Sequence, residues 1–140
     1  MRISTKGRYS ISVLLYLAQH RDEGNITLRE ISEKLDISKK YLEQIVSILN
    51  RGRLLSTNRG AQGGYRLAVN PARCSVGDVL RLTENTLCQF QDSDSSYYSD
   101  DPTEYVWDGL SGVINEYLDS ITLQDILDSI TQSYVNNYVI

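Results

Sequence analysis

The stretch SKKYLEQIVSILNRGRLLSTNRGAQGGYRL, residues 38–67, decides the fold. Ser38 is a favourable N-cap, because its hydroxyl can accept a backbone N–H from the first helical turn. Apolar residues then recur at spacings of three and four up to Asn50, which predicts an amphipathic helix with one buried face. These apolar residues are Leu42, Ile45, Val46 and Leu49.

The second half of this stretch predicts a β-hairpin. Residues 54–57 and 65–67 have the composition of two short strands, and residues 58–64 form a glycine-rich turn between them. Gly60, Gly63 and Gly64 permit positive φ angles and let backbone N–H groups approach an anion, while Arg59 and Arg66 add positive charge. We interpret the hairpin as the wing of a DNA-binding domain, and a plain structural hairpin is the alternative.

Two further helices are predicted before residue 38. The first runs over residues 5–22, with an apolar stripe at helical spacing. Thr27 and Glu30 have the spacing of a capping box, which opens a short second helix. The connection to the next helix, around Asp36 and Ile37, is about three residues long, as in a helix-turn-helix. We therefore predict a mainly α fold with a small β-hairpin, a winged helix-turn-helix.

The face of the 38–50 helix opposite its apolar stripe is polar and rich in groups that bind base edges or phosphates. An exposed helix face without a binding role would look similar, so the hairpin that follows supports the DNA-binding interpretation. The polar residues of this face are Lys39, Lys40, Glu43, Gln44, Ser47, Asn50 and Arg51.

Charge is segregated along the chain, so the net charge of -4 is misleading. All 14 Lys and Arg residues lie within residues 2–81, which hold seven acidic residues and therefore carry +7. Residues 82–140 hold eleven acidic residues and no Lys or Arg. The basic half suits a polyanion, and the acidic half should lie away from phosphate or meet another partner.

The acidic half is expected to contain a dimerisation helix. Residues 84–101 are expected to be a flexible acidic loop, and Pro102 to begin a helix whose apolar stripe runs to about Asp119. We expect this stripe to pack against the same helix of a second subunit in a homodimer. Packing of the stripe on its own domain is the alternative. A short helix capped by Thr122 and a tail over residues 134–140 complete domains predicted at 1–83, 84–101 and 102–133.

The sequence carries little sign of a catalytic or metal site. Cys74 and Cys88 share no short ligand spacing, and His20 is expected at a helix surface. Histidine-based triads and paired catalytic carboxylates in a plausible pocket are also missing, so we do not expect an enzyme. The polar N-terminus and the lack of long apolar runs predict a cytoplasmic protein that does not bind membranes.

Three motifs resemble the Rrf-two family of winged-helix transcription regulators: ISTKGRY at residues 3–9, YLEQIV at 41–46 and RGAQGGYRL at 59–67. Over nearly its whole length the chain is most similar to the CymR-type cysteine-metabolism repressors of that family. This similarity includes SVGDVLRLTE at residues 75–84 and the region from WDGL at 107–110 to LDSITLQDIL at 118–127.

The resemblance implies a homodimeric repressor on a pseudo-palindromic operator in double-stranded DNA. Glu43 then matches a base-reading acid, Gln44 a neighbour that can meet adenine, and Arg59 a wing residue that enters the minor groove. Phosphate or orientation contacts are expected from Lys6, Arg8, Lys39, Lys40 and Tyr41. The expected DNA interface also includes Ser38, Ser47, Arg51, Gly60, Gly63, Gly64 and Tyr65.

The resemblance also bears on cofactors and protein partners. Cluster-binding members have three cysteines in the loop that here holds only Cys88, so no iron–sulfur cofactor is expected. A cluster shared by two Cys88 thiolates and other ligands, and a redox role for Cys88, are the alternatives. CymR-type proteins work with cysteine synthase, whose active site accepts a C-terminal isoleucine. The ending Tyr138, Val139, Ile140 is expected to dock there, and a tail without a role is the alternative.

A second function class also follows from the sequence. The winged helix could serve as a protein-interaction module that regulates a sulfur-assimilation enzyme, with little operator specificity.

Overall fold

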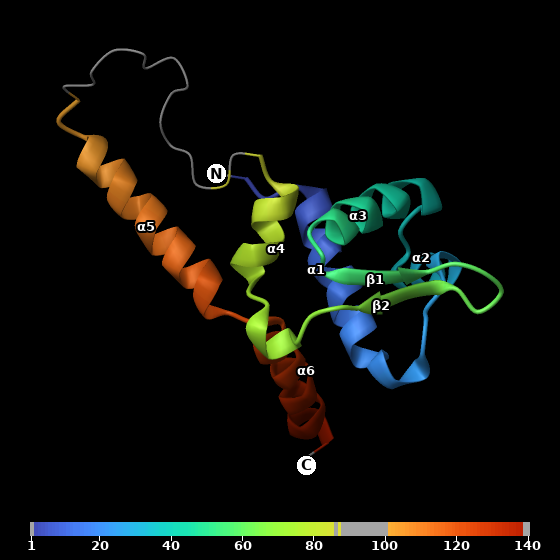
Figure 1. The fold of residues 1–140 in the computed structure, drawn as a ribbon. Helices are drawn as coiled ribbons and strands as arrows, with labels where there is room; N and C mark the ends of the chain where they lie inside the picture. The colour runs from blue at the N-terminus through green and yellow to red at the C-terminus, as the bar shows by residue number, and fades with distance from the viewer. Residues whose placement is uncertain (1, 86, 88–100, 139–140) are drawn as a thin grey trace.

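The computed structural model describes residues 2–85, 87 and 101–138, which form six α-helices, two short 3-10 helices and one β-hairpin (Figure 1). The fold class predicted from the sequence is confirmed. In chain order the elements are α1 (Thr5–Gln19), η1 (Arg21–Glu23), α2 (Leu28–Leu35), α3 (Lys39–Arg51), β1 (Leu55–Asn58), β2 (Gly64–Leu67), η2 (Pro71–Arg73), α4 (Val76–Thr83), α5 (Glu104–Ser120) and α6 (Leu123–Tyr138).

One apolar core holds α1, α2, α3 and the hairpin together. Leu14 of α1, Ile31 of α2 and Leu42 of α3 are each fully buried. Burying a side chain of this size stabilises a fold by about 1.5–3 kcal/mol, so the apolar stripes predicted from the sequence hold the helices in place. The polar face of α3 is therefore left at the surface.

The hairpin is antiparallel, with Leu55 opposite Leu67 and Asn58 opposite Gly64. A further antiparallel bridge joins it to the connection between η1 and α2. In this bridge the Ile26 N–H donates to the Tyr65 carbonyl at 3.0 Å, and the Tyr65 N–H donates to the Ile26 carbonyl at 2.8 Å. The strands thus lie between α3, which packs on β1, and the end of α1 (Figure 1).

The acidic half is not a separate body, because the start of α6 belongs to the core of the basic half. Leu123 is fully buried. Its N–H donates to the Cys74 carbonyl at 2.9 Å, and the Val76 N–H donates to the Ile121 carbonyl at 2.8 Å. The start of α6 is therefore anchored next to α4.

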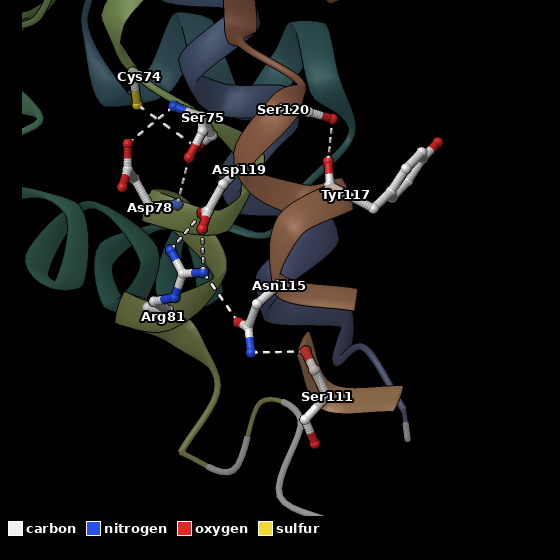
Figure 2. Close-up of polar contacts among 9 residues, drawn as sticks. All are labelled: Cys74, Ser75, Asp78, Arg81, Ser111, Asn115, Tyr117, Asp119 and Ser120. Atoms are coloured by element: carbon white, nitrogen blue, oxygen red, sulfur yellow. Dashed lines mark hydrogen bonds and ion pairs between the residues drawn. The ribbon is translucent and has the colours of Figure 1, made fainter. Parts of the chain in front are cut away.

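The long helix α5 projects from the body of the molecule, and its C-terminal part contacts α4 (Figure 1). Arg81 of α4 holds it through the Asp119 carboxylate, at 2.6 and 3.0 Å, and through the Asn115 amide oxygen at 3.0 Å (Figure 2). The Arg81 guanidinium lowers the pKa of Asp119, so this pair is charged at neutral pH.

Some predicted boundaries are wrong by a few residues. α5 begins at Glu104, so Pro102 precedes its first turn, whereas α1 ends at Gln19, before the predicted limit of Asp22, and is followed by η1. The last helix is long, because α6 continues to Tyr138 through residues expected to form a tail. None of the helices among the described residues is long and apolar enough to cross a membrane.

Candidate nucleic-acid interface

The predicted reading face is the exposed side of α3. Ser38 caps the helix as expected, and its hydroxyl accepts the N–H of Tyr41 at 3.2 Å. Glu43, Gln44 and Ser47 are exposed, while Leu42 and Ile45 are fully buried on the other side. The remaining polar residues of this face, Ser38, Lys39, Lys40, Asn50 and Arg51, are exposed as well.

A groove of about 250 Å³ joins this face to the hairpin. Glu43 and Ser47 line it from α3, and Thr57 and Tyr65 line it from the strands. The Thr57 hydroxyl donates to Asn50 Oδ1 at 3.3 Å, which ties α3 to β1. The structure therefore brings Glu43, Ser47 and Tyr65 together, whereas Gln44 and Arg51 lie outside the groove.

Thr57 was not among the predicted site residues, and Asn50 was noted only as part of the polar face. Both are short polar side chains whose meeting depends on how the hairpin folds back on the helix. The only sequence signal for it is the closeness of the helix end and the first strand.

The turn between the strands has the backbone that its glycines allow. Gly60 has φ +104° and Gly64 has φ +147°, which are positive angles that other residues rarely adopt. The Gly63 N–H donates to the Gly60 carbonyl at 2.9 Å and closes the turn. Arg59 is exposed within it, which is compatible with insertion into a narrow minor groove.

Hydrogen bonds of two asparagines hold the hairpin near its turn. Asn58 Nδ2 donates to Asn25 Oδ1 at 3.0 Å, and Asn25 Nδ2 donates to the Gln62 carbonyl at 3.0 Å. With the Ile26–Tyr65 bridge, these bonds fix the direction in which Arg59 is presented. The sequence did not predict these asparagine contacts.

The beginning of α1 lies next to the beginning of α3. The rings of Tyr9 and Tyr41 meet edge to face, with centroids 5.8 Å apart. This contact places Lys6 and Arg8 on a helix beside the one that carries Lys39 and Lys40. The start of α1 is fixed in turn by Ser4, whose N–H and hydroxyl donate to Glu84 Oε1 at 2.8 and 2.7 Å.

The described residues do not supply a metal site. Nowhere among them do three His, Cys, Asp or Glu side chains group in a way that could hold a metal ion. Cys74 is a poor ligand, because it is only 3% exposed and its burial raises the thiol pKa to about 11. Cys88, Val139 and Ile140 lie outside the described residues, and Tyr138 is the last residue of α6.

Comparisons with known proteins agree with this architecture. A family model described as Rrf2, an iron-dependent transcriptional regulator, matches residues 3–129. The CymR regulator of Bacillus subtilis is 35% identical over 127 residues, which cover 90% of this chain and 89% of that protein.

Two solved structures are similar over nearly their whole lengths. The structure of IscR from T. potens has a TM-score of 0.77 and 39% identity, and the match covers 95% of this chain and 90% of that one. The structure of CymR, titled the global cysteine regulator of B. subtilis, also has a TM-score of 0.77, with 33% identity over 92% of this chain and 98% of that chain. This chain belongs to the Rrf2 family of transcriptional regulators.

Proposed function

We propose that the protein is a homodimeric, sequence-specific repressor of the bacterial cytoplasm, which reads a pseudo-palindromic operator with α3 and the wing. The observation that carries the proposal is the groove in which Glu43 and Ser47 of α3 meet Thr57 and Tyr65 of the hairpin. A polar reading helix braced against a wing is the arrangement by which winged-helix proteins enter the major groove.

The roles of the side chains follow from their chemistry. The Glu43 carboxylate accepts from cytosine N4, and Gln44 pairs with adenine through its amide. Arg59 enters the minor groove, with Gly60, Gly63 and Gly64 keeping the wing backbone close to the DNA. The remaining contacts are made to phosphates and fix the register; they come from Lys6, Arg8, Ser38, Lys39, Lys40, Tyr41 and Arg51.

The exposed apolar face of α5 supports the homodimer. Tyr105, Val113 and Tyr117 are 77%, 65% and 64% exposed, and Trp107 and Leu110 are each 41% exposed. Several large apolar side chains exposed on one helix are unusual for a monomer and are typical of an interface. The two-fold symmetry of such a dimer matches that of a pseudo-palindromic operator.

We further propose that this member works without an iron–sulfur cluster. The buried Cys74 thiol leaves Cys88 as the one cysteine per chain that is available for a cluster or for redox chemistry. One thiolate per subunit is fewer than a cluster normally requires.

The control of cysteine metabolism is proposed from the similarity to the B. subtilis cysteine regulator. Docking of Tyr138, Val139 and Ile140 into cysteine synthase is part of this proposal. Because α6 runs to Tyr138, such docking requires the end of the helix to unwind. Truncation of the last four residues should abolish binding to purified cysteine synthase in calorimetry, and unchanged binding would exclude this part of the proposal.

The alternative, a protein-interaction module with little operator specificity, is favoured by no particular contact in the described residues. The two functions differ in their response to salt and sequence. We expect the purified protein to bind fragments from sulfur-metabolism promoters more tightly than scrambled duplexes, with an affinity that falls steeply as salt rises. Equal affinity for both duplexes would favour the interaction module.

A further inference from the structure

A second cavity, of about 280 Å³, lies at the base of the wing on the side away from α3. The end of α1 and η1 form one wall of this wing-base cavity, and β2 with the outer residues of β1 forms the other. α3 packs on β1, and no α3 residue is among the described residues that line the wing-base cavity, whereas Tyr65 lines both this cavity and the groove at the reading face.

Two arginines line the cavity. Arg21 and Arg66 face it from the two walls, and among the described residues neither guanidinium forms an ion pair. His20 lies beside them, held by Glu23 through its Nδ1 at 2.8 Å and by the ring of Tyr16. No acidic side chain is among the described residues that line the cavity.

The floor of the cavity is apolar. Leu17 and Ile26 are 1% and 3% exposed, and Leu67 completes the surface. Two arginine forks above an apolar floor suit a molecule with an anionic end and a short apolar part. Pockets for drug-sized ligands have volumes of about 300–1,000 Å³, so this one fits a smaller metabolite.

We propose that the wing-base cavity binds a small organic anion, a carboxylate or phosphate ester with a short apolar part, and that this ligand acts as an effector of DNA binding. The anion bridges Arg21 and Arg66 and so links the end of α1 to β2. The proposed binding site does not depend on the proposed function of the protein. The proposed effect of the ligand on DNA binding does rest on that function.

The coupling follows from the contacts at the cavity wall. Ile26 and Tyr65 both line the cavity and are joined by two backbone hydrogen bonds, and Asn58 joins the same wall to Asn25. A ligand bound between the two walls restricts the motion of the wing before DNA binds. The wing then loses less conformational freedom when it binds DNA. We therefore expect the ligand to increase operator affinity, and the operator to increase ligand affinity by the same factor.

The single histidine of the chain offers a direct readout, since the His20 ring lines the cavity. The full-length protein would be titrated with 3-methylbutanoate, succinate and glycerol 3-phosphate, each to about 10 mM, while the His20 ring resonance is followed by proton NMR. We expect a saturable shift with at least one probe. Arg21→Gln and Arg66→Gln should each weaken that probe's binding about tenfold, and Arg73→Gln, an exposed control in η2, should leave it unchanged.

Two results would overturn the site. One is the absence of a saturable shift with every probe. The other is an equal shift with sodium sulfate that the two variants do not change, which would indicate an unspecific anion effect. If Arg66→Gln weakened DNA binding without any probe as strongly as Lys40→Ala, Arg66 would be a phosphate contact, and the effector assignment would fail.

The regulatory step is tested separately, by measuring operator affinity with and without the probe that binds. An increase that Arg66→Gln removes supports the coupling. A probe that binds without changing operator affinity overturns the coupling and leaves the site in place. If the protein bound no operator at all, the repressor proposal would fail while the NMR titration still decided the site.

Discussion

We propose that single side chains of the interface divide into those that read bases and those that contact the phosphate backbone. Glu43 and Lys40 are both exposed on α3, but only Glu43 lines the groove shared with the hairpin. Ser38 caps α3 as the sequence predicted. The Asn25–Asn58 contact could not be foreseen, because it joins residues 33 positions apart and leaves no periodic signal in the sequence.

Replacement of Glu43 should separate specificity from affinity. Glu43→Ala is expected to lose about 1–3 kcal/mol of discrimination between the operator and a scrambled duplex, because the acceptor for one base is removed. Lys40→Ala is the control and should weaken both duplexes alike, with the slope of log affinity against log salt reduced by about 1. Fluorescence anisotropy measures the affinity for both duplexes. If Glu43→Ala weakened binding to the operator and to the scrambled duplex equally, Glu43 would not be a base-reading residue.

Cys74 should be inert at neutral pH. Burial, with a smaller effect of the nearby Asp78, raises its pKa from 9.0 to about 11. At about pH 8 the thiolate fraction is then about one in a thousand rather than about one in ten. In a Cys88→Ser variant, a thiol-specific disulfide reagent should react only after unfolding in urea. Rapid reaction of the native variant would show that the Cys74 site opens readily.

Among the secondary-structure elements, the wing depends on two glycines for different reasons. A Cβ on Gly64 would lie 2.5 Å from the Ile26 carbonyl oxygen, whereas a Cβ on Gly60 would meet nothing within 4 Å. Both residues have positive φ, so alanine is strained at either position.

Gly64→Ala should therefore cost more than Gly60→Ala. We expect a loss of at least about 2 kcal/mol in the free energy of unfolding for Gly64→Ala and about 1 kcal/mol for Gly60→Ala, measured by urea denaturation. Gly64→Ala should also weaken operator binding, because the bridge to Ile26 must shift. Equal losses of stability in the two variants would contradict the close approach at Gly64.

In the proposed dimer, the contact between α4 and α5 should set the distance between the two α3 helices that read the operator. Because the pKa of Asp119 is lowered, its pair with Arg81 is complete at neutral pH and is lost only as the pH falls below the ordinary carboxyl range. Asp119→Asn removes the charge, and Glu116→Gln is the control on an exposed neighbour of α5.

With Asp119→Asn we expect weaker discrimination between the operator and the same operator with one base pair inserted between its half-sites. Glu116→Gln should retain the discrimination of the natural protein in the same anisotropy assay. Unchanged discrimination in Asp119→Asn would mean that other contacts fix α5.

In α6 the start of the helix could be predicted from the sequence, and its end could not. Its first turn was predicted, because Thr122 and Asp125 form a capping box, with bonds of 2.9 and 3.1 Å between each backbone N–H and the other side chain. Its continuation over residues 134–138 was missed, because residues 134–137 are all exposed and carry no apolar stripe. Helical residues without a buried face give no periodicity to detect.

For the whole molecule, charge segregation predicted two parts, but the core joins them. Leu123 is buried among residues of the basic half, so the start of α6 is part of that core. In the sequence, Leu123 looks like any other apolar residue of an amphipathic helix, and nothing indicates that it packs into the core formed by the basic half. The sequence therefore indicated which segments are apolar, and not where each one packs.

We expect α5 to be the dimerisation helix of the assembly. Leu110→Asp should shift the protein from a dimer to a monomer of 15.9 kDa in light scattering, because a charge would be buried in an apolar interface. Gln132→Asp, on the exposed end of α6, is the matched control and should remain dimeric. A dimeric Leu110→Asp protein would locate the interface elsewhere.

The most direct test of the account is footprinting of the purified protein on its own upstream region and on sulfur-metabolism promoters. We expect one protected segment with two symmetric half-sites, about one helical turn or a multiple of it apart, which resists excess non-specific competitor DNA. Glu43→Ala should lose this protection at concentrations where Gln132→Asp keeps it. The absence of any protected segment, or protection that non-specific DNA removes equally, would contradict operator reading by α3 and the wing.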